Sequence, residues 1–306
     1  MTDTAARQSD TGWSQRRERG SLLLLRLMAL FSERTGRRAG RIVLYGIATY
    51  FFLFAPRARR ASLEYLRRVL GRRPRASERF RQVMSFATSI HDRVYLLNGR
   101  FELFDFEVVG EQDMHELLRA GGGAFLLGAH LGSFEATRAI GWRRPVTRIV
   151  MMMYEHNARK INAALTAINP AATADIVTLS DNPLAMLKVQ DLLAEGAFVG
   201  MLADRTPGEE PTETVPFLGG AARFPTGPWR IAALLRRPAF LMLGLYLGGN
   251  RYRVVFEPLA DFTSVRRPER EAAIRAAIVR YAARLEHYCR EHPDNWFNFF
   301  DFWAHG

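Results

Sequence analysis

The sequence of 306 residues is poor in cysteine and lysine, and each shortage has a consequence. Cys289 is the only cysteine, so no internal disulfide is possible, and a reducing compartment is the expected setting. Lysine occurs only at positions 160 and 188, because nearly all basic residues are arginine. A GC-rich genome accounts for that preference. It does not account for where the arginines lie.

Acidic residues are scarce in the first third of the chain. Residues 1–100 carry 21 basic and 7 acidic side chains, a net charge of +14, whereas residues 101–306 carry 22 and 24, a net charge of −2. Such a basic arm predicts an anionic partner, which is membrane lipid, nucleic acid or an acidic protein. Few aromatic residues interleave with the arginines and no nucleic-acid motif is present, so nucleic acid is the least favoured of the three.

Several motifs of common enzymes are also missing. Gly121-Gly122-Gly123 precedes a strand, whereas a dinucleotide fingerprint follows one, and no Gly-Lys-Ser/Thr phosphate loop occurs. There is no Gly-x-Ser-x-Gly nucleophile elbow. His130 and Glu135 have no further histidine or cysteine at a convincing metal-ligand spacing. The sequence therefore predicts neither a metal nor an organic cofactor.

No apolar run has a clear membrane-spanning length. The run from Ser21 to Phe31 is interrupted by Arg26 and has no convincing cleavage site, so a cleavable signal peptide is not expected. Ile42 to Ala55 is free of charge, but fourteen helical residues cover roughly 21 Å of a hydrocarbon core of roughly 30 Å. Arginines on both flanks and several aromatic residues favour a helix lying on an anionic membrane. Two ordinary helices packed on the main domain are the alternative.

Strand-like and helix-like segments alternate through the rest of the chain. Periodicity and turn residues predict helices between the strands and a long helix from Arg267 to Arg290. This alternation predicts an α/β three-layer domain with a largely parallel mixed sheet flanked by helices, over residues 105–306, after an N-terminal helical membrane-associating region over residues 1–104. The expected strands are Phe106–Val109, Phe125–Gly128, Thr147–Met153, Asp175–Leu179, Ala197–Leu202 and a hairpin of Ala239–Tyr246 with Tyr252–Glu257.

The most informative stretch is Ala124-Phe-Leu-Leu-Gly-Ala-His-Leu-Gly-Ser-Phe-Glu-Ala-Thr-Arg138. It predicts a buried strand, a turn with Ser133 as N-cap, and a helix with Glu135 in its first turn. His130 lies in the connection. A carboxylate about one turn later fixes the imidazole tautomer and leaves the other ring nitrogen free as a base. A structural histidine at a strand end is the alternative.

Two later blocks also place polar residues after strands, where α/β sheets bind ligands, and a third block follows them. Arg159 follows the strand ending at Met153, and Asp204 and Arg205 follow the strand ending at Leu202. Arg223 lies in Val215-Pro-Phe-Leu-Gly-Gly-Ala-Ala-Arg-Phe-Pro-Thr-Gly227. Arginine at such a position suits a phosphate or another polar headgroup. The chain ends in the aromatic tail His292-Pro-Asp-Asn-Trp-Phe-Asn-Phe-Phe-Asp-Phe-Trp303, which we expect to pack across the sheet or to touch lipid.

The His-x4-Glu arrangement and the order of these blocks resemble the lysophospholipid acyltransferase superfamily, in particular the branch of the bacterial lipid A late acyltransferases and related predicted acyltransferases. The resemblance implies a transferase that moves a fatty or polyene acyl group from a thioester to a hydroxyl or amine of a lipid-like acceptor. It implies His130 as base and Glu135 as its partner. Substrate contacts are implied for Arg159, Asp204, Arg205 and Arg223.

The resemblance also implies acyl carrier protein or acyl-CoA as donor, and a location on the cytoplasmic face of the bacterial inner membrane. The basic arm favours the carrier protein, because carrier proteins are strongly acidic. A catalytically inactive acyl-lipid binding protein of the same fold is the alternative function. We expect Asp204 to orient Arg159 or Arg205, and backbone N–H groups from Gly132 to Phe134 to stabilise the oxyanion.

Overall fold

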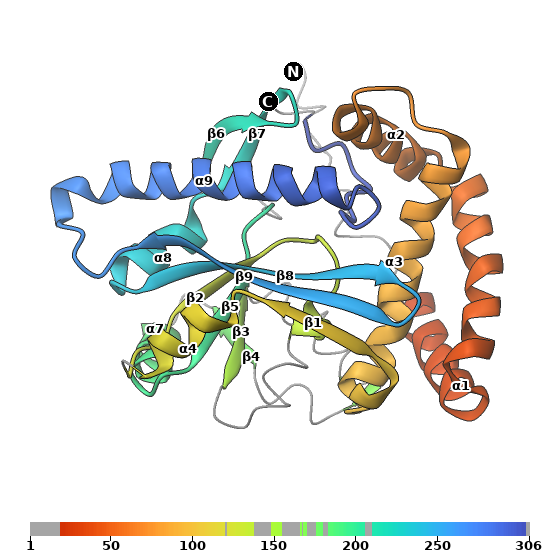
Figure 1. Ribbon diagram of the computed structural model, residues 1–306, viewed down its shortest axis with the longest axis horizontal. Helices are drawn as coiled ribbons and strands as arrows, with labels where there is room; N and C mark the ends of the chain where they lie inside the picture. The colour runs from red at the N-terminus through yellow and green to blue at the C-terminus, as the bar shows by residue number, and fades with distance from the viewer. Residues whose placement is uncertain are drawn as a thin grey trace, which may run out of the picture.

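The apolar runs of the chain form one seven-stranded sheet at the centre of the molecule (Figure 1). A computed structural model describes residues 19–119, 121–137, 148–154, 166, 168–169, 176–179, 183–205 and 210–303. The strand order is β1-β9-β8-β2-β5-β3-β4. Its members are β1 (Asp105–Val109), β2 (Phe125–Gly128), β3 (Ile149–Tyr154), β4 (Ile176–Leu179), β5 (Phe198–Leu202), β8 (Pro238–Gly248) and β9 (Arg251–Asp261).

Strand directions make this sheet mixed. β8, β2, β5, β3 and β4 are mutually parallel, and the antiparallel hairpin β8–β9 reverses the direction of β9 and of β1 beside it. Parallel central strands are buried on both faces, which explains why Phe125–Gly128 and Phe198–Leu202 read as continuous apolar runs. The expectation of a largely parallel mixed sheet is confirmed.

Helices cover both faces of the sheet. Phe125 and Leu127 of β2 share a core with α7 (Pro183–Ala194), α8 (Gly227–Leu234) and α9 (Arg270–Glu291). Leu126 points to the opposite face and joins the cluster that includes α4 (Glu111–Arg119). Figure 1 shows α9 lying across one face of the sheet. The alternation along β2 thus places a helical layer on each side.

A short hairpin was not expected from the sequence. β6 (Thr212–Phe217) and β7 (Gly220–Pro225) pair as a separate two-stranded sheet, packed against α9. Leu218 and Gly219 join them, both with positive φ, as a tight two-residue turn of the primed type requires. Phe217, Phe224 and Trp229 are fully buried in the main core. These three side chains are therefore part of the hydrophobic core.

Three helices precede the sheet: α1 (Arg19–Phe54), α2 (Pro56–Leu70) and α3 (Ala76–Leu97). α1 is broken at Gly36, whose φ of 81° is outside the helical region. α2 starts at Pro56, because proline cannot continue the preceding helix but suits a first helical turn. The break between α2 and α3 contains the segment Arg72-Arg73-Pro74-Arg75.

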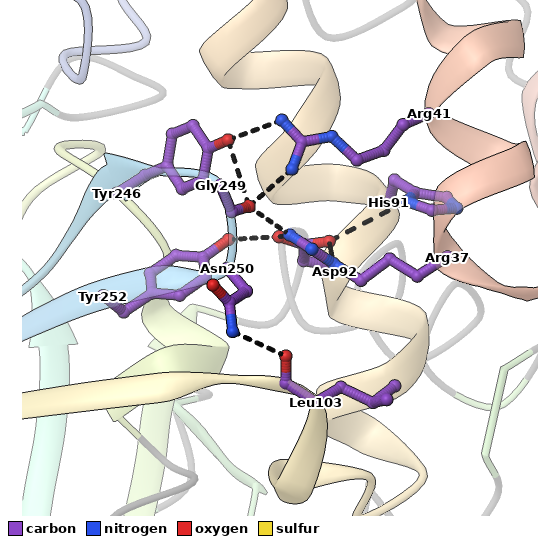
Figure 2. A network of polar contacts seen from close by, with 9 residues as sticks. All are labelled: Arg37, Arg41, His91, Asp92, Leu103, Tyr246, Gly249, Asn250 and Tyr252. Atoms are coloured by element: carbon purple, nitrogen blue, oxygen red, sulfur yellow. Dashed lines mark hydrogen bonds and ion pairs between the residues drawn. The ribbon is translucent and has the colours of Figure 1, made fainter.

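A buried polar network holds these helices to the sheet (Figure 2). The Asp92 carboxylate on α3 accepts two hydrogen bonds of 2.7 Å from the Arg37 guanidinium on α1, and one of 2.8 Å from the Tyr252 hydroxyl on β9. Arg37 also donates to the carbonyl of Gly249 at the β8–β9 turn, and Arg41 donates to the Tyr246 hydroxyl. Arg37 and Arg41 belong to the basic arm for which the sequence predicted an anionic partner, but both form hydrogen bonds within the protein.

The outer surface of α1 is apolar beyond this network. Ile42, Tyr45, Tyr50, Phe51 and Phe54 are each more than half exposed. Exposed arginines lie before this surface at Arg34 and Arg38 and after it at Arg57, Arg59 and Arg60. No single described helix has the length and hydropathy to cross a bilayer, although the pair Gly36–Phe54 and Pro56–Leu70, bent by 91°, passes the test together.

Candidate active site

The candidate site lies where β2 ends, in the middle of the sheet. Gly132 has a φ of 80°, and a side chain there would collide with the carbonyl oxygen of Gly244 on β8. The Ser133 N–H donates to that carbonyl at 2.7 Å, and the Ser133 hydroxyl caps the following helix through the N–H of Ala136. The predicted strand, turn and N-cap are confirmed. This close packing fixes the backbone on which His130 stands.

Asp204 is the carboxylate that holds His130. It follows β5, the neighbour of β2, and its side chain is 1% exposed. Its Oδ1 lies 2.9 Å from His130 Nδ1, and its Oδ2 accepts from the His130 backbone N–H at 3.0 Å. The Trp296 indole N–H donates to the same Oδ2 at 3.3 Å. Both oxygens are thus satisfied, and ring and backbone of His130 are tied to one group.

These contacts keep Asp204 ionised. Burial alone would raise the pKa of its carboxyl group, but the interactions with His130 and the positive charge of Arg205 outweigh burial and lower that pKa. An ionised carboxylate only accepts hydrogen bonds. It therefore favours the tautomer with a proton on Nδ1, which leaves the Nε2 lone pair of His130 available.

Two guanidinium groups stand beside the imidazole. Arg205 Nε lies 2.9 Å from His130 Nδ1, and the charge of Arg93 on α3 also acts on the ring. Burial lowers the pKa of His130, and the charges of Arg205 and Arg93 lower it further against the opposing effect of Asp204. The imidazole is therefore neutral at neutral pH. Its side chain is still 35% exposed, so a substrate can reach it.

Glu135 does not occupy the position expected for it. Its Oε1 forms an ion pair of 2.8 Å with Arg93 Nε, and its Oε2 accepts from the Ser133 hydroxyl at 3.3 Å. Among the described residues, the imidazole's carboxylate partner is Asp204. The expectation of a direct Glu135–His130 contact is therefore wrong. The reason is the start of the helix at Phe134, which presents Glu135 to α3, whereas the parallel strand β5 delivers Asp204 to the ring.

The other expected site residues have different outcomes. Arg205 lies at the imidazole, as described above, whereas Arg223 is exposed on β7 and donates to the Thr212 hydroxyl across the β6–β7 hairpin at 3.0 Å. Asp204 binds His130 and was not expected to do so. Arg159 lies outside the described residues.

The C-terminal tail is part of the site, which sequence reasoning missed. The Phe297 N–H donates to the His130 carbonyl at 2.8 Å, and the Gly132 N–H donates to the Asn295 carbonyl at 2.9 Å. The Asn295 side chain bonds both the N–H and the C=O of Tyr246. The tail thus occupies the Gly132 N–H, and Gly244 on β8 occupies the Ser133 N–H, so neither of these expected oxyanion donors is free. The concentration of Asn and aromatic residues in the tail was the sequence feature that could have indicated its place in the site.

A family model for bacterial lipid A biosynthesis acyltransferases matches residues 21–304, nearly the whole chain. The chain belongs to this family. A search of curated proteins gave no match. The family match confirms the resemblance found in the sequence, and the protein is a lipid A-type acyltransferase. The family does not by itself name the donor, the acceptor or the residues that act in this chain.

Proposed function

We propose that this lipid A-type acyltransferase moves an acyl group from a thioester to a hydroxyl or amine of a lipid-like acceptor, with His130 as general base. The observation that carries the proposal is a partly exposed imidazole whose Nδ1 lies 2.9 Å from the buried Asp204 carboxylate. The lowered pKa of His130 favours its neutral form. A base in that state accepts a proton at Nε2 and is stabilised by the carboxylate once it becomes an imidazolium.

The reaction needs no covalent acyl-enzyme. Nε2 of His130 takes the proton of the acceptor hydroxyl or amine as its oxygen or nitrogen attacks the thioester carbonyl. The carbon–sulfur bond of the resulting tetrahedral intermediate then breaks, and the imidazolium returns the proton to the leaving thiolate. The products are the ester or amide and a free thiol. Asp204 remains ionised throughout, because its role is to orient the ring and to balance its charge.

Negative charge on the tetrahedral oxygen requires stabilisation, and the arginines beside His130 are the groups proposed to supply it. Arg205 is stacked over the Phe300 ring, with its guanidinium carbon 5.0 Å from the ring centre, and is held close to the imidazole. Arg93 is fixed from the other side by Glu135. Preorganised cations near developing charge give large transition-state stabilisation. Glu135 then supports catalysis through Arg93. Arg159 and Arg223 are the further substrate contacts of this proposal.

The exposed surface of α1 supports association with a membrane, which we place at the cytoplasmic face of the inner membrane. Its exposed Ile42, Tyr45 and Phe54 suit the boundary between headgroups and acyl chains, and the flanking exposed arginines suit anionic headgroups. Arg37 and Arg41 are excluded from this role by their bonds inside the protein. The proposed geometry is a helix lying on the membrane, with the α/β domain on the aqueous side.

An acyl carrier protein is the favoured donor over coenzyme A. α2 and the start of α3 carry exposed arginines that could meet an acidic partner. Within the part of the chain that the structure describes, Arg72 alone among them has a carboxylate partner, which is Glu78. Charge of one sign over such a surface steers an oppositely charged protein towards the site. The arginines concerned are Arg57, Arg59, Arg60, Arg67, Arg72, Arg73, Arg75 and Arg81.

The function is tested by lipid profiling of a strain that lacks the protein. Complementation with the natural sequence should restore one acylated lipid species, and complementation with His130→Ala should not. Arg280→Ala, an exposed change on α9, controls for expression. Equal restoration by His130→Ala would refute the proposed mechanism and would favour an acyl-lipid binding protein.

A further inference from the structure

Two buried asparagines in the C-terminal tail differ sharply in their surroundings. Asn295 is fully buried, and its side chain donates to the Tyr246 carbonyl and accepts from the Tyr246 N–H. Asn298 is 1% exposed, yet neither its Oδ1 nor its Nδ2 has a hydrogen-bond partner among the described residues. An unpaired buried amide lowers stability, so a residue of this kind in a native structure calls for an explanation.

The contacts of its neighbours show which way Asn298 faces. Phe297 and Phe299 both pack against Phe86 on α3, with ring centres 5.3 and 5.4 Å away. Trp296 and Phe300 point to the other side, where Trp296 bonds Asp204 and Phe300 lies under Arg205. Side chains of an extended segment alternate between two sides. Asn298 lies between Trp296 and Phe300 in this alternation, so it is on the side of Asp204 and Arg205.

Asn298 is also close to His130 along the backbone. The N–H of the preceding residue, Phe297, donates to the carbonyl of His130. Asn298 therefore directly follows a backbone contact with the residue that we propose as the base, and the alternation places its side chain on the side of Asp204 and Arg205. The Asn298 carboxamide is neutral and has a free N–H₂ donor and a free C=O acceptor. It is therefore suited to a ligand group that also offers a hydrogen-bond donor and an acceptor.

We propose that Asn298 binds a secondary amide of the acyl donor, namely the cysteamine amide of its pantetheine arm. This inference rests on the proposed function, since it assumes a thioester donor. The amide is separated from the thioester sulfur by a two-carbon link, so a reacting carbonyl placed at His130 brings the amide near the adjacent residues. Carrier protein and coenzyme A share the pantetheine arm. Asn298 then recognises the donor whichever carrier delivers it.

A lipid-like acceptor with an amide-linked acyl chain offers the same chemical group, so the experiment uses probes for both sources. The donor probe is S-octylpantetheine, a thioether that cannot react. Its control is the analogue in which methylene groups replace the cysteamine amide. The acceptor probe is N-octanoylglucosamine. Binding of each to the full chain is measured by calorimetry for the natural protein, Asn298→Leu and Asn295→Leu.

We expect Asn298→Leu to weaken S-octylpantetheine binding by about 10- to 100-fold, as for loss of a buried hydrogen-bonded pair. The amide-free analogue should bind both proteins equally. The melting temperature of Asn298→Leu should be unchanged or higher, because an unpaired polar group is replaced by an apolar one of similar size. Asn295→Leu should melt lower, because it removes two satisfied bonds. Asn298→Ala serves as a second variant, with the same binding loss expected.

Unchanged binding of S-octylpantetheine by Asn298→Leu, or an equal loss for the amide-free analogue, would overturn the assignment. A loss confined to N-octanoylglucosamine would overturn it as well, by moving the amide to the acceptor. A fall in melting temperature without any binding change would show a structural role. These results are separate from the proposed function, whose failure would appear as full activity of His130→Ala.

Discussion

Replacement of Asp204 by asparagine is the sharpest test of the site. The substitution keeps the shape of the side chain but removes the charge that faces His130 Nδ1 at 2.9 Å. It also places an N–H₂ group opposite one of two donors, either the imidazole N–H that faces Oδ1 or the backbone N–H of His130 that donates to Oδ2. The preferred tautomer changes, and the imidazolium formed during proton transfer loses its counter-charge.

The size of the effect follows from the geometry. Two unit charges about 4 Å apart interact by roughly 4 kcal/mol at an effective dielectric constant of about 20. That energy, lost only in the transition state, corresponds to a fall in kcat of about 1,000-fold. Steady-state acyl transfer with purified protein and a fixed acyl thioester measures it, and the KM for the donor should change little.

Glu135→Gln is the matched control, since it makes the same chemical change at the carboxylate that binds Arg93. We expect a smaller loss, about 10- to 100-fold, because the charge of Glu135 reaches the ring through Arg93 alone. Both variants should remain folded, as judged by circular dichroism. A kcat for Asp204→Asn within tenfold of the natural protein, or a larger loss for Glu135→Gln, would refute the assignment of Asp204 as the partner of His130.

The remaining predictions concern pH, stability, membrane and donor. The lowered pKa of His130 means that kcat/KM should fall only as pH drops below about 6.5, the ordinary value, and a midpoint above it would contradict the neutral-base reading. Arg37→Ala should cost about 3–5 kcal/mol of unfolding free energy in urea titrations, because the buried Asp92 carboxylate loses its guanidinium partner, and Arg37→Ala with Asp92→Asn should recover part of it. Ile42→Glu with Phe54→Glu should abolish flotation with anionic vesicles without lowering the melting temperature; unchanged flotation would remove α1 from the membrane. Transfer from an acyl carrier protein should slow as salt rises while transfer from the matching coenzyme A ester changes less, and a salt-independent carrier reaction would exclude electrostatic steering.

Local features of the chain were predictable because they depend on neighbours in sequence. Apolar runs preceded by glycine predicted the strands around Phe125 and Phe198, and Ser133 was predicted as the N-cap of the next helix. Pro56 marked the corner between the first two helices. The order of these elements, together with His130 and the later blocks, was enough to indicate the family that the family model confirms.

Contacts between distant segments were decided only by the tertiary structure. Asp204 lies 74 positions beyond His130, and its contact with the imidazole depends on the pairing of β2 with β5. A spacing of five residues favoured Glu135, but the direction in which the helix leaves the turn gives that carboxylate to Arg93. Arg37 likewise looked like part of a surface charge until Asp92 was placed beside it. Charge and polarity along a sequence show which groups need partners, and packing determines which partners they find.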